Sequence, residues 1–196
     1  MPIITFNKKE LLKLVGKKLS DRQLEEVISL IKPGVELQTA TEITLEAYAD
    51  RPDLFGVEGL ARAIRSYLGL QVGLKKYKVD KPKWILKVSR VPIRPFVAAA
   101  VVKNVKMTNE FLKSLIGLQE VLHETFGRKR RKVAIGLHDY SKIKPPISYA
   151  GVEKEAKMVP LDCKEELTLQ EVLEKIPKGQ EYGTIISSAR LWPVFK

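Results

Sequence analysis

Apolar and polar positions recur along this chain with both helical and strand periods. Residues 8–15 keep helical spacing between Asn7, which is placed to cap the helix, and Gly16, which is placed to end it. Ser20 opens a second helix with a capping box. Residues 35–49 then alternate between the two classes, which is typical of a half-buried strand.

The next part of the pattern predicts a helix and then a break between two modules. Asp53 follows a turn and is placed to cap a helix, which Gly69 ends. Residues 73–82 are basic and end in proline, which predicts a linker. The resulting domain division is 1–82 and 83–196.

Three strands and a long helix are expected after the linker. Residues 84–89 and 96–105 read as strands, and the second is so apolar that both of its faces should be covered. Thr108 caps a helix that runs to about Phe126. A further strand is expected over 132–138.

The pattern closes with a short helix over 168–176 and an apolar strand over 191–195. That strand runs straight into Lys196 with no polar tail, so we expect a truncated protein. The predicted fold class is α+β: a small N-terminal α/β domain, followed by the first part of a mixed α/β module that is truncated at the C-terminus.

Composition narrows the function classes. The 196 residues are 44% hydrophobic and 30% charged, which excludes a disordered tail and a fibrous repeat. An excess of 35 Lys and Arg over 23 Asp and Glu gives a net charge of +12, which points to a polyanion nearby, nucleic acid or an anionic membrane surface. The single cysteine, Cys163, fits a reducing, cytoplasmic setting. With two histidines beside it, we expect no metal site, and no apolar run is long enough to cross a bilayer.

One dense basic run stands between the long helix and the strand expected after it. Its members are Arg128, Lys129, Arg130, Arg131 and Lys132. The run has three interpretations: a solvated basic turn, a phosphate-contacting patch, or a nuclear localisation signal, although such signals are usually exposed and flexible. Alternation along the expected strand would split these side chains between two faces.

Gln119 lies in the middle of the apolar stripe of the long helix, between Leu115 and Leu122. An amide there costs free energy unless it finds hydrogen-bond partners. It is either a satisfied core glutamine or an amide that lines a pocket.

Other candidate chemistry is weak. His138 and Asp139 are adjacent on an expected strand and so point to opposite faces, which argues against a catalytic dyad. Cys163 follows Asp162, which disfavours a thiolate, and we interpret it as structural. Phosphate-loop, dinucleotide-fold and zinc-protease signatures are absent from the sequence. The residues alone therefore indicate a basic, two-module α/β protein that touches nucleic acid.

Two sets of residues carry a resemblance to a known family. The first set is Asp50-Arg51-Pro52-Asp53-Leu54 with Val57-Glu58-Gly59-Leu60-Ala61-Arg62. It resembles the N-R-P-D-L…EG-[IL]-AR signature of phenylalanyl-tRNA synthetase beta subunits, with Asp50 in place of the usual Asn. The second set is Ile93-Arg94-Pro95-Phe96, Leu118-Gln119-Glu120, Gly127-Arg128-Lys129-Arg130, Val133-Ala134-Ile135-Gly136 and Asp139. In this order and spacing it resembles the archaeal and eukaryotic form of that subunit, and the likeness covers nearly the whole chain.

The resemblance implies a class II synthetase of two alpha and two beta chains, in which the alpha chain activates phenylalanine with ATP and magnesium and charges tRNA(Phe). The beta chain carries a small N-terminal domain, similar to residues 1–82, and an editing module, whose first part is similar to 83–196. Further beta domains would follow Lys196. The resemblance implies no cofactor for this part of the chain, and a cytoplasmic location.

An editing site has a physical rationale. Tyrosine is phenylalanine plus a hydroxyl, and an apolar pocket rejects an added hydroxyl only about a hundredfold. A second site can bind tyrosine through buried polar groups that phenylalanine would leave unpaired, and hydrolyse its ester to tRNA. The fragment alone need not be active, because it holds half a site.

The resemblance places Gln119 and Arg130 at the editing cleft. Gln119 would hydrogen-bond around the bound amino acid, and Arg130, together with Arg128, would hold the terminal adenosine phosphate or brace the cleft. The residues assigned to tRNA contacts are Arg128, Lys129, Arg131 and Lys132. No side chain is a convincing general base, so we expect a water held by backbone groups and substrate-assisted chemistry.

Two rival hypotheses remain at this stage. One is a non-catalytic module that docks tRNA or the alpha chain through its basic face. The other is a free-standing trans-editing protein of this length.

Overall fold

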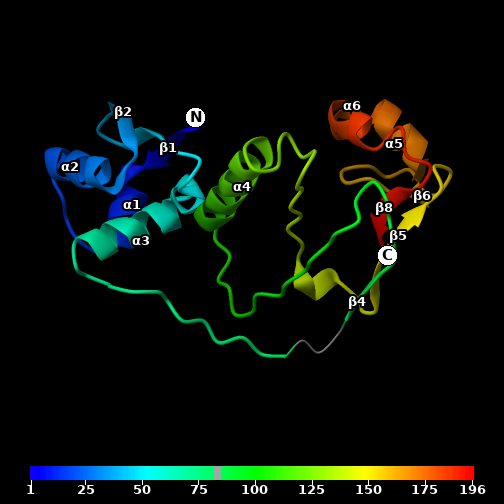
Figure 1. The fold of residues 1–196 in the computed structure, drawn as a ribbon, viewed down its shortest axis with the longest axis horizontal. Helices are drawn as coiled ribbons and strands as arrows, with labels where there is room; N and C mark the ends of the chain where they lie inside the picture. Colours follow the sequence, from blue (N-terminus) through cyan, green and yellow to red (C-terminus); the bar gives the residue numbers. More distant parts are fainter. Residues whose placement is uncertain (82–84) are drawn as a thin grey trace. The chain divides into compact units, whose positions relative to one another are not determined.

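The computed structural model describes residues 1–81 and 85–196, which form two compact units (Figure 1). One unit comprises Met1–Lys78 and Lys106–Ile135, and the other comprises Val79–Val105 and Gly136–Lys196. Both units combine helices with strands, which confirms the predicted α+β class. The predicted domain boundary between residues 82 and 83 stays a prediction.

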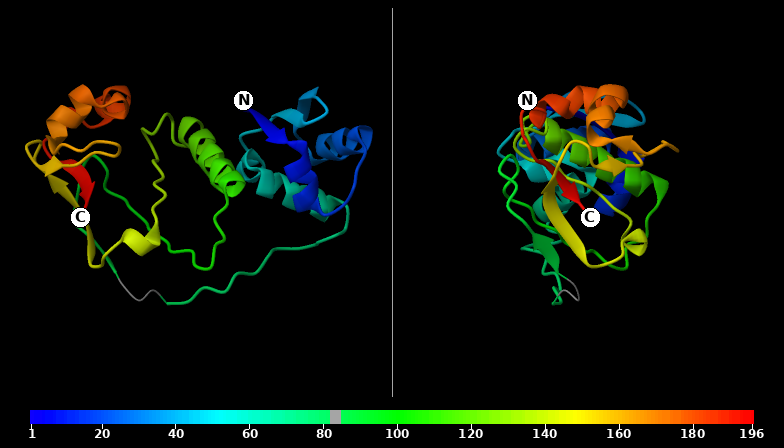
Figure 2. Two further views of the ribbon diagram at one scale, coloured as in Figure 1. Left: turned by 180° about the vertical axis from the view of Figure 1, so that it is seen from behind. Right: turned by 90° about the vertical axis from the view of Figure 1, so that its right-hand side faces the viewer.

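The first unit is built on a three-stranded antiparallel sheet in the order β1-β3-β2. Its elements are β1 (Ile3–Asn7), α1 (Lys8–Val15), α2 (Asp21–Ile31), β2 (Gly34–Gln38), β3 (Glu42–Glu46), a 3₁₀ turn (Pro52–Phe55), α3 (Val57–Tyr67) and α4 (Asn109–Glu124). Helices α1, α2 and α3 gather beside the sheet, as the two views of Figure 2 also show. The side chains between them are almost completely buried and include Leu11, Val15, Leu24, Ile28, Ile43, Leu60 and Ile64. Burying an aliphatic side chain of this kind contributes roughly 1.5–3 kcal/mol.

The caps expected for helices α1 and α2 are present. The Asn7 side chain accepts a hydrogen bond from the Glu10 amide at 3.0 Å, and Gly16 ends α1 in the left-handed region with φ 74°. Ser20 and Gln23 form the expected capping box of α2. These signals are predictable because each cap joins groups only three residues apart.

Two expectations about the N-terminal unit are wrong. Asp53 does not cap α3, whose N-cap residue is Gly56; its carboxylate instead accepts two hydrogen bonds from the Arg51 guanidinium, each 2.9 Å long. These bonds are the main reason that the pKa of Asp53 is lowered. The single strand expected over 35–49 is a hairpin of β2 and β3.

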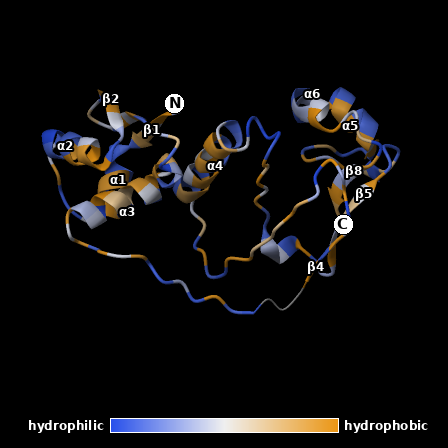
Figure 3. Ribbon diagram, viewed as in Figure 1, coloured by the Kyte–Doolittle hydropathy of each residue, from blue (hydrophilic) through white to orange (hydrophobic). Residues whose placement is uncertain are grey.

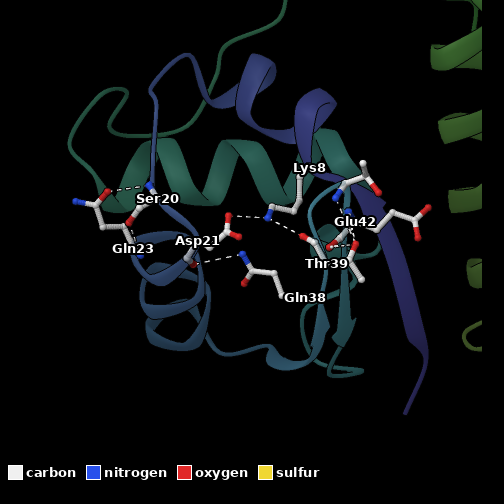
Figure 4. Close-up of polar contacts among 8 residues, drawn as sticks. Lys8, Ser20, Asp21, Gln23, Gln38, Thr39 and Glu42 are labelled. Atoms are coloured by element: carbon white, nitrogen blue, oxygen red, sulfur yellow. Dashed lines mark hydrogen bonds and ion pairs between the residues drawn. The ribbon is translucent and has the colours of Figure 1, made fainter.

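Lys8, the first residue of α1, is buried although it carries a charge (Figure 4). Its Nζ donates hydrogen bonds to Asp21 Oδ1 at 2.6 Å and to the Thr39 carbonyl oxygen at 2.8 Å. The side chain thus joins the starts of α1 and α2 to the β2–β3 turn, and a buried ammonium requires such partners.

In its described residues, the second unit contains two small sheets and two short helices. One sheet has the order β4-β5-β8, in which β4 pairs with β5 in parallel and β5 pairs with β8 antiparallel. Strands β6 and β7 form the other sheet and are antiparallel. Its elements are β4 (Leu86–Val88), a 3₁₀ turn (Tyr140–Lys142), β5 (Ile147–Val152), β6 (Lys157–Met158), β7 (Leu167–Thr168), α5 (Leu169–Lys175), α6 (Pro177–Tyr182), a second 3₁₀ turn (Gly183–Ile185) and β8 (Trp192–Phe195). Val152, Leu169 and Trp192 form its core cluster. The predicted helix near 168–176 and the final strand are confirmed, and the predicted start of a strand at Trp84 lies outside the described residues.

Two further predicted strands are wrong. Residues 96–105 and 132–138 form no strand, and both segments are largely exposed. Phe96 is 92% exposed and Val102 is 76% exposed, so the covered faces expected for the first segment do not exist. Figure 3 shows hydrophobic residues along this irregular stretch between β4 and α4. The physical reason is that a strand needs a partner for its backbone groups, and neither segment is paired with one among the described residues.

Candidate functional site

The candidate site is built on α4 and the turn that follows it. The Thr108 hydroxyl accepts a hydrogen bond from the Phe111 amide at 3.2 Å, which confirms the predicted start of this helix. The predicted apolar stripe is only partly covered: Leu112 is 40% exposed and Phe126 is 47% exposed. Gln119 is therefore half-buried on a helix face that is itself half-buried, not in a closed core.

The helix ends where two backbone segments meet closely at Gly127. The Gly127 amide donates to the Leu122 carbonyl oxygen at 2.8 Å, which closes the last turn. A Cβ atom at this position would lie 2.5 Å from the His123 carbonyl oxygen and 2.6 Å from that of Val133. Only glycine fits between these two oxygens.

Three consecutive residues after Gly127 adopt the left-handed conformation. Their φ angles are 50° for Arg128, 53° for Lys129 and 62° for Arg130. Such a conformation costs a non-glycine residue roughly 1–2 kcal/mol. Several backbone hydrogen bonds hold the turn, among them one from the Lys132 amide to the Gly127 carbonyl oxygen at 2.7 Å and one from the Arg130 amide to the His123 carbonyl oxygen at 3.2 Å. The basic run is thus a shaped turn and not the beginning of a strand.

The turn brings Arg130 back onto α4, where it pairs with Glu120. Arg130 Nη2 lies 2.8 Å from Glu120 Oε1 and 2.7 Å from Oε2. The Arg130 side chain is 18% exposed and that of Glu120 is 44% exposed, so the pair is partly shielded from water. Sequence reasoning assigned Gln119 and Arg130 but not Glu120. The sequence offered one hint: Glu120 is an acidic residue next to Gln119, and the basic run begins eight residues after it. A turn that folds back onto the helix can bring an arginine of that run to this carboxylate.

His123 is completely buried beneath this turn. Its Nε2 accepts a hydrogen bond from the Ile135 amide at 2.7 Å, so the ring proton belongs on Nδ1. Nδ1 lies 3.5 Å from Glu120 Oε1, longer than an ordinary hydrogen bond. His123 thus ties α4 to the segment after the basic run.

The remaining members of the basic run surround an open hollow of about 780 Å³. Arg128, Lys129, Arg131 and Lys132 are its lining residues. The expected split of the run between two strand faces is wrong because there is no strand. The separation of Arg130 from its neighbours arises from the left-handed turn, which directs Arg130 to Glu120.

Other candidate groups are not part of this arrangement. The Asp139 carboxylate accepts hydrogen bonds from the Ser141 hydroxyl and amide, which lower its pKa and cap a 3₁₀ turn of the second unit. Cys163 is a half-buried free thiol. Within residues 1–81 and 85–196, no group of three or more His, Cys, Asp and Glu could hold a metal ion. In the same described residues, no helix is both long and apolar enough to span a bilayer.

Comparison with known proteins identifies relatives of the chain. No family model matches it. A phenylalanine–tRNA ligase beta subunit of Methanosarcina barkeri is 41% identical over 197 residues, which cover 99% of this chain and 36% of that protein. The corresponding subunit of Thermococcus kodakarensis is 41% identical over 203 residues, which cover 99% of this chain and 35% of that protein.

This chain is related to the phenylalanyl-tRNA synthetase beta subunit. A crystal structure of an N-terminal fragment of that subunit from Pyrococcus horikoshii agrees with a TM-score of 0.93 at 38% identity, covering 99% of this chain and 58% of the other. The resemblance drawn from the sequence motifs is therefore confirmed. The chain spans about a third of the length of the curated beta subunits it matches.

Proposed function

We propose that this chain is part of a phenylalanyl-tRNA synthetase beta subunit and forms one wall of a site that hydrolyses Tyr-tRNA(Phe). The Glu120–Arg130 pair on the turn after α4 is the observation that supports the proposal most. It joins two residues from separate motifs of the family resemblance, next to Gln119 and beside a hollow lined only by cations.

Each part of the site has a proposed role. Arg130, fixed by Glu120, braces the wall, since a guanidinium and a carboxylate hold each other strongly. The half-buried Gln119 amide hydrogen-bonds around the bound amino acid. The residues around the hollow, Arg128, Lys129, Arg131 and Lys132, contact phosphates of the tRNA.

The proposed reaction is a hydrolysis of an ester. A water adds to the carbonyl carbon of the tyrosyl ester, the bond from that carbon to the ribose oxygen breaks, and tyrosine and tRNA are released. In this proposal, backbone groups hold the water and the substrate assists proton transfer. Discrimination follows from polar groups that pair with the tyrosine hydroxyl and that phenylalanine would leave unpaired.

The test is deacylation of Tyr-tRNA(Phe) by the whole synthetase carrying Gln119→Ala or Arg130→Ala. We expect each variant to slow hydrolysis by about tenfold or more, which is a loss of about 1.4 kcal/mol or more in transition-state stabilisation, with phenylalanine charging unchanged. Gln170→Ala and Arg190→Ala are matched controls in the exposed parts of the second unit. Unchanged deacylation in both test variants would overturn the site assignment.

A second candidate function is a non-catalytic module that docks tRNA or the alpha chain. The cation-lined hollow favours it as well. A docking module of this kind should bind tRNA in a salt-sensitive way, and Gln119→Ala should leave that binding unchanged. No form of the protein should hydrolyse the ester.

Several properties of the whole enzyme come only from the resemblance. These are the use of ATP and magnesium, the assembly of two alpha with two beta chains, and a cytoplasmic location. They stay predictions for the complete synthetase.

A further inference from the structure

A second basic surface lies on α1 and the connection that follows it. A hollow of about 490 Å³ is lined there by Lys9, Lys13, Lys17 and Lys18, above Leu12 and Leu19. We call it the lysine hollow. All four lysines are exposed, and no Asp or Glu is among the lining residues.

The backbone beneath the lysine hollow is well braced. Lys9 and Lys13 are one helical turn apart on α1, about 6 Å along its axis. The Arg65 guanidinium donates a hydrogen bond from Nη1 to the Val15 carbonyl oxygen at 2.9 Å, which supports the end of α1. Leu12 and Leu19 pack against the main core, so the floor of the hollow is closed.

The lysines of the hollow differ from Lys8 and Lys32 of the same unit, each of which has an acidic partner. Lys8 pairs with Asp21 and Lys32 pairs with Asp50. In the described parts of the chain, the four hollow lysines form no ion pair. Lys13 acts at longer range on Glu10 and Glu110. The pKa of Glu10 is raised first by burial and that of Glu110 is lowered first by its own backbone amide, and Lys13 is the weakest cause in both. Four cations around one concave space repel each other, and a polyanion would relieve that repulsion.

We propose that the lysine hollow is a second RNA-binding surface, which takes backbone phosphates of the tRNA. This proposal rests on the proposed function, because that function makes tRNA the RNA that is bound. Its residues lie on α1 and the connection after it, and none of them belongs to the turn after α4. Ammonium groups are suited to phosphates as point charges. A membrane surface fits less well, because Leu12 and Leu19 form the half-buried floor, whereas membrane-surface elements expose apolar residues for insertion.

The test measures tRNA binding by the whole synthetase between about 50 and 200 mM salt. The test variant combines Lys9→Ala, Lys17→Ala and Lys18→Ala, and leaves Lys13 in place because of its influence on Glu110. Each lost phosphate contact reduces the slope of log affinity against log salt by roughly 0.7–0.9, so the slope should become shallower by about 2. The control combines Lys144→Ala, Lys157→Ala and Lys164→Ala, which removes the same charge from exposed positions of the second unit and should change the slope by less than about 1.

Four outcomes decide the inference. A shallower slope in the test variant alone, with an unchanged unfolding midpoint, supports it. Equal slopes in both variants overturn it, as does a loss of binding to phosphatidylserine vesicles with tRNA binding unchanged, which would indicate a membrane surface. Neutralising Arg128 and Lys129 in parallel separates the two proposals: if only that variant loses tRNA affinity, the lysine hollow fails as an RNA site while the proposed function stands.

Discussion

Gly127 illustrates how a single residue shapes the candidate site. Two carbonyl oxygens occupy the space that a side chain would need, and the left-handed basic turn begins at the next residue. The position of the Arg130 side chain thus depends on a residue that carries no chemistry itself.

Replacing Gly127 with alanine should therefore destabilise the protein by about 2 kcal/mol, within the range for overpacked sites. Gly117, on helix α4, has open space around its Cβ position, so Gly117→Ala should be neutral or stabilise by up to about 1 kcal/mol. Urea unfolding of both variants measures the difference. Equal stability of the two would mean that the close approach at Gly127 is absent.

Lys8 gives a second prediction at the scale of the residue. Lys8→Ala removes two short hydrogen bonds of a buried ammonium, to Asp21 and Thr39, and should cost about 2 kcal/mol. Lys9→Ala, at the exposed neighbouring position, should change stability by less than about 0.5 kcal/mol. Thermal or urea unfolding distinguishes the two, and a Lys8→Ala protein as stable as Lys9→Ala would contradict the buried role.

At the scale of the element, helix α5 begins with a capping box in which Glu171 pairs with both Thr168 and Lys175. The Lys175 ammonium, and then the Thr168 amide and hydroxyl, lower the pKa of Glu171 from its ordinary 4.5 to about 2. A lowered pKa means that the carboxylate stabilises the folded state above pH 4.5, and that this contribution is lost as the pH falls toward about 2.

Carboxyl NMR titration should show Glu171 titrating near pH 2. In Lys175→Ala the strongest of the causes is removed, so the pKa should rise toward its ordinary value. A pKa that does not differ between the two proteins would contradict the Lys175 contact.

The elements also show what a sequence can and cannot predict. The caps at Asn7, Ser20 and Thr108 were predictable because each one depends on groups three residues apart. The strands expected over 96–105 and 132–138 were not formed, because apolar composition does not supply a pairing partner.

The candidate site was partly predictable for the same reason. Motif resemblance indicated Gln119 and Arg130. The contact of Arg130 with Glu120 depends on a left-handed turn over buried His123, and no local spacing announces such a turn.

At the scale of the whole molecule, the net charge of +12 includes two basic hollows in the first unit. One is the hollow of the basic run after α4, and the other is the lysine hollow on α1. The basic side chains of both hollows lie outside the hydrophobic core. Their charges can therefore be removed by substitution without removing a core side chain. The relation to synthetase beta subunits makes tRNA the polyanion that we propose for both.

The editing proposal is tested most directly by a double-mutant cycle on Tyr-tRNA(Phe) hydrolysis. The whole synthetase would carry Glu120→Ala, Arg130→Ala, or both. Because the two side chains hold each other, each single change should slow hydrolysis by about tenfold or more, and the double change should be no slower than the more damaging single change. The wild-type rate of hydrolysis in all three variants would contradict the assignment of this wall to an editing site.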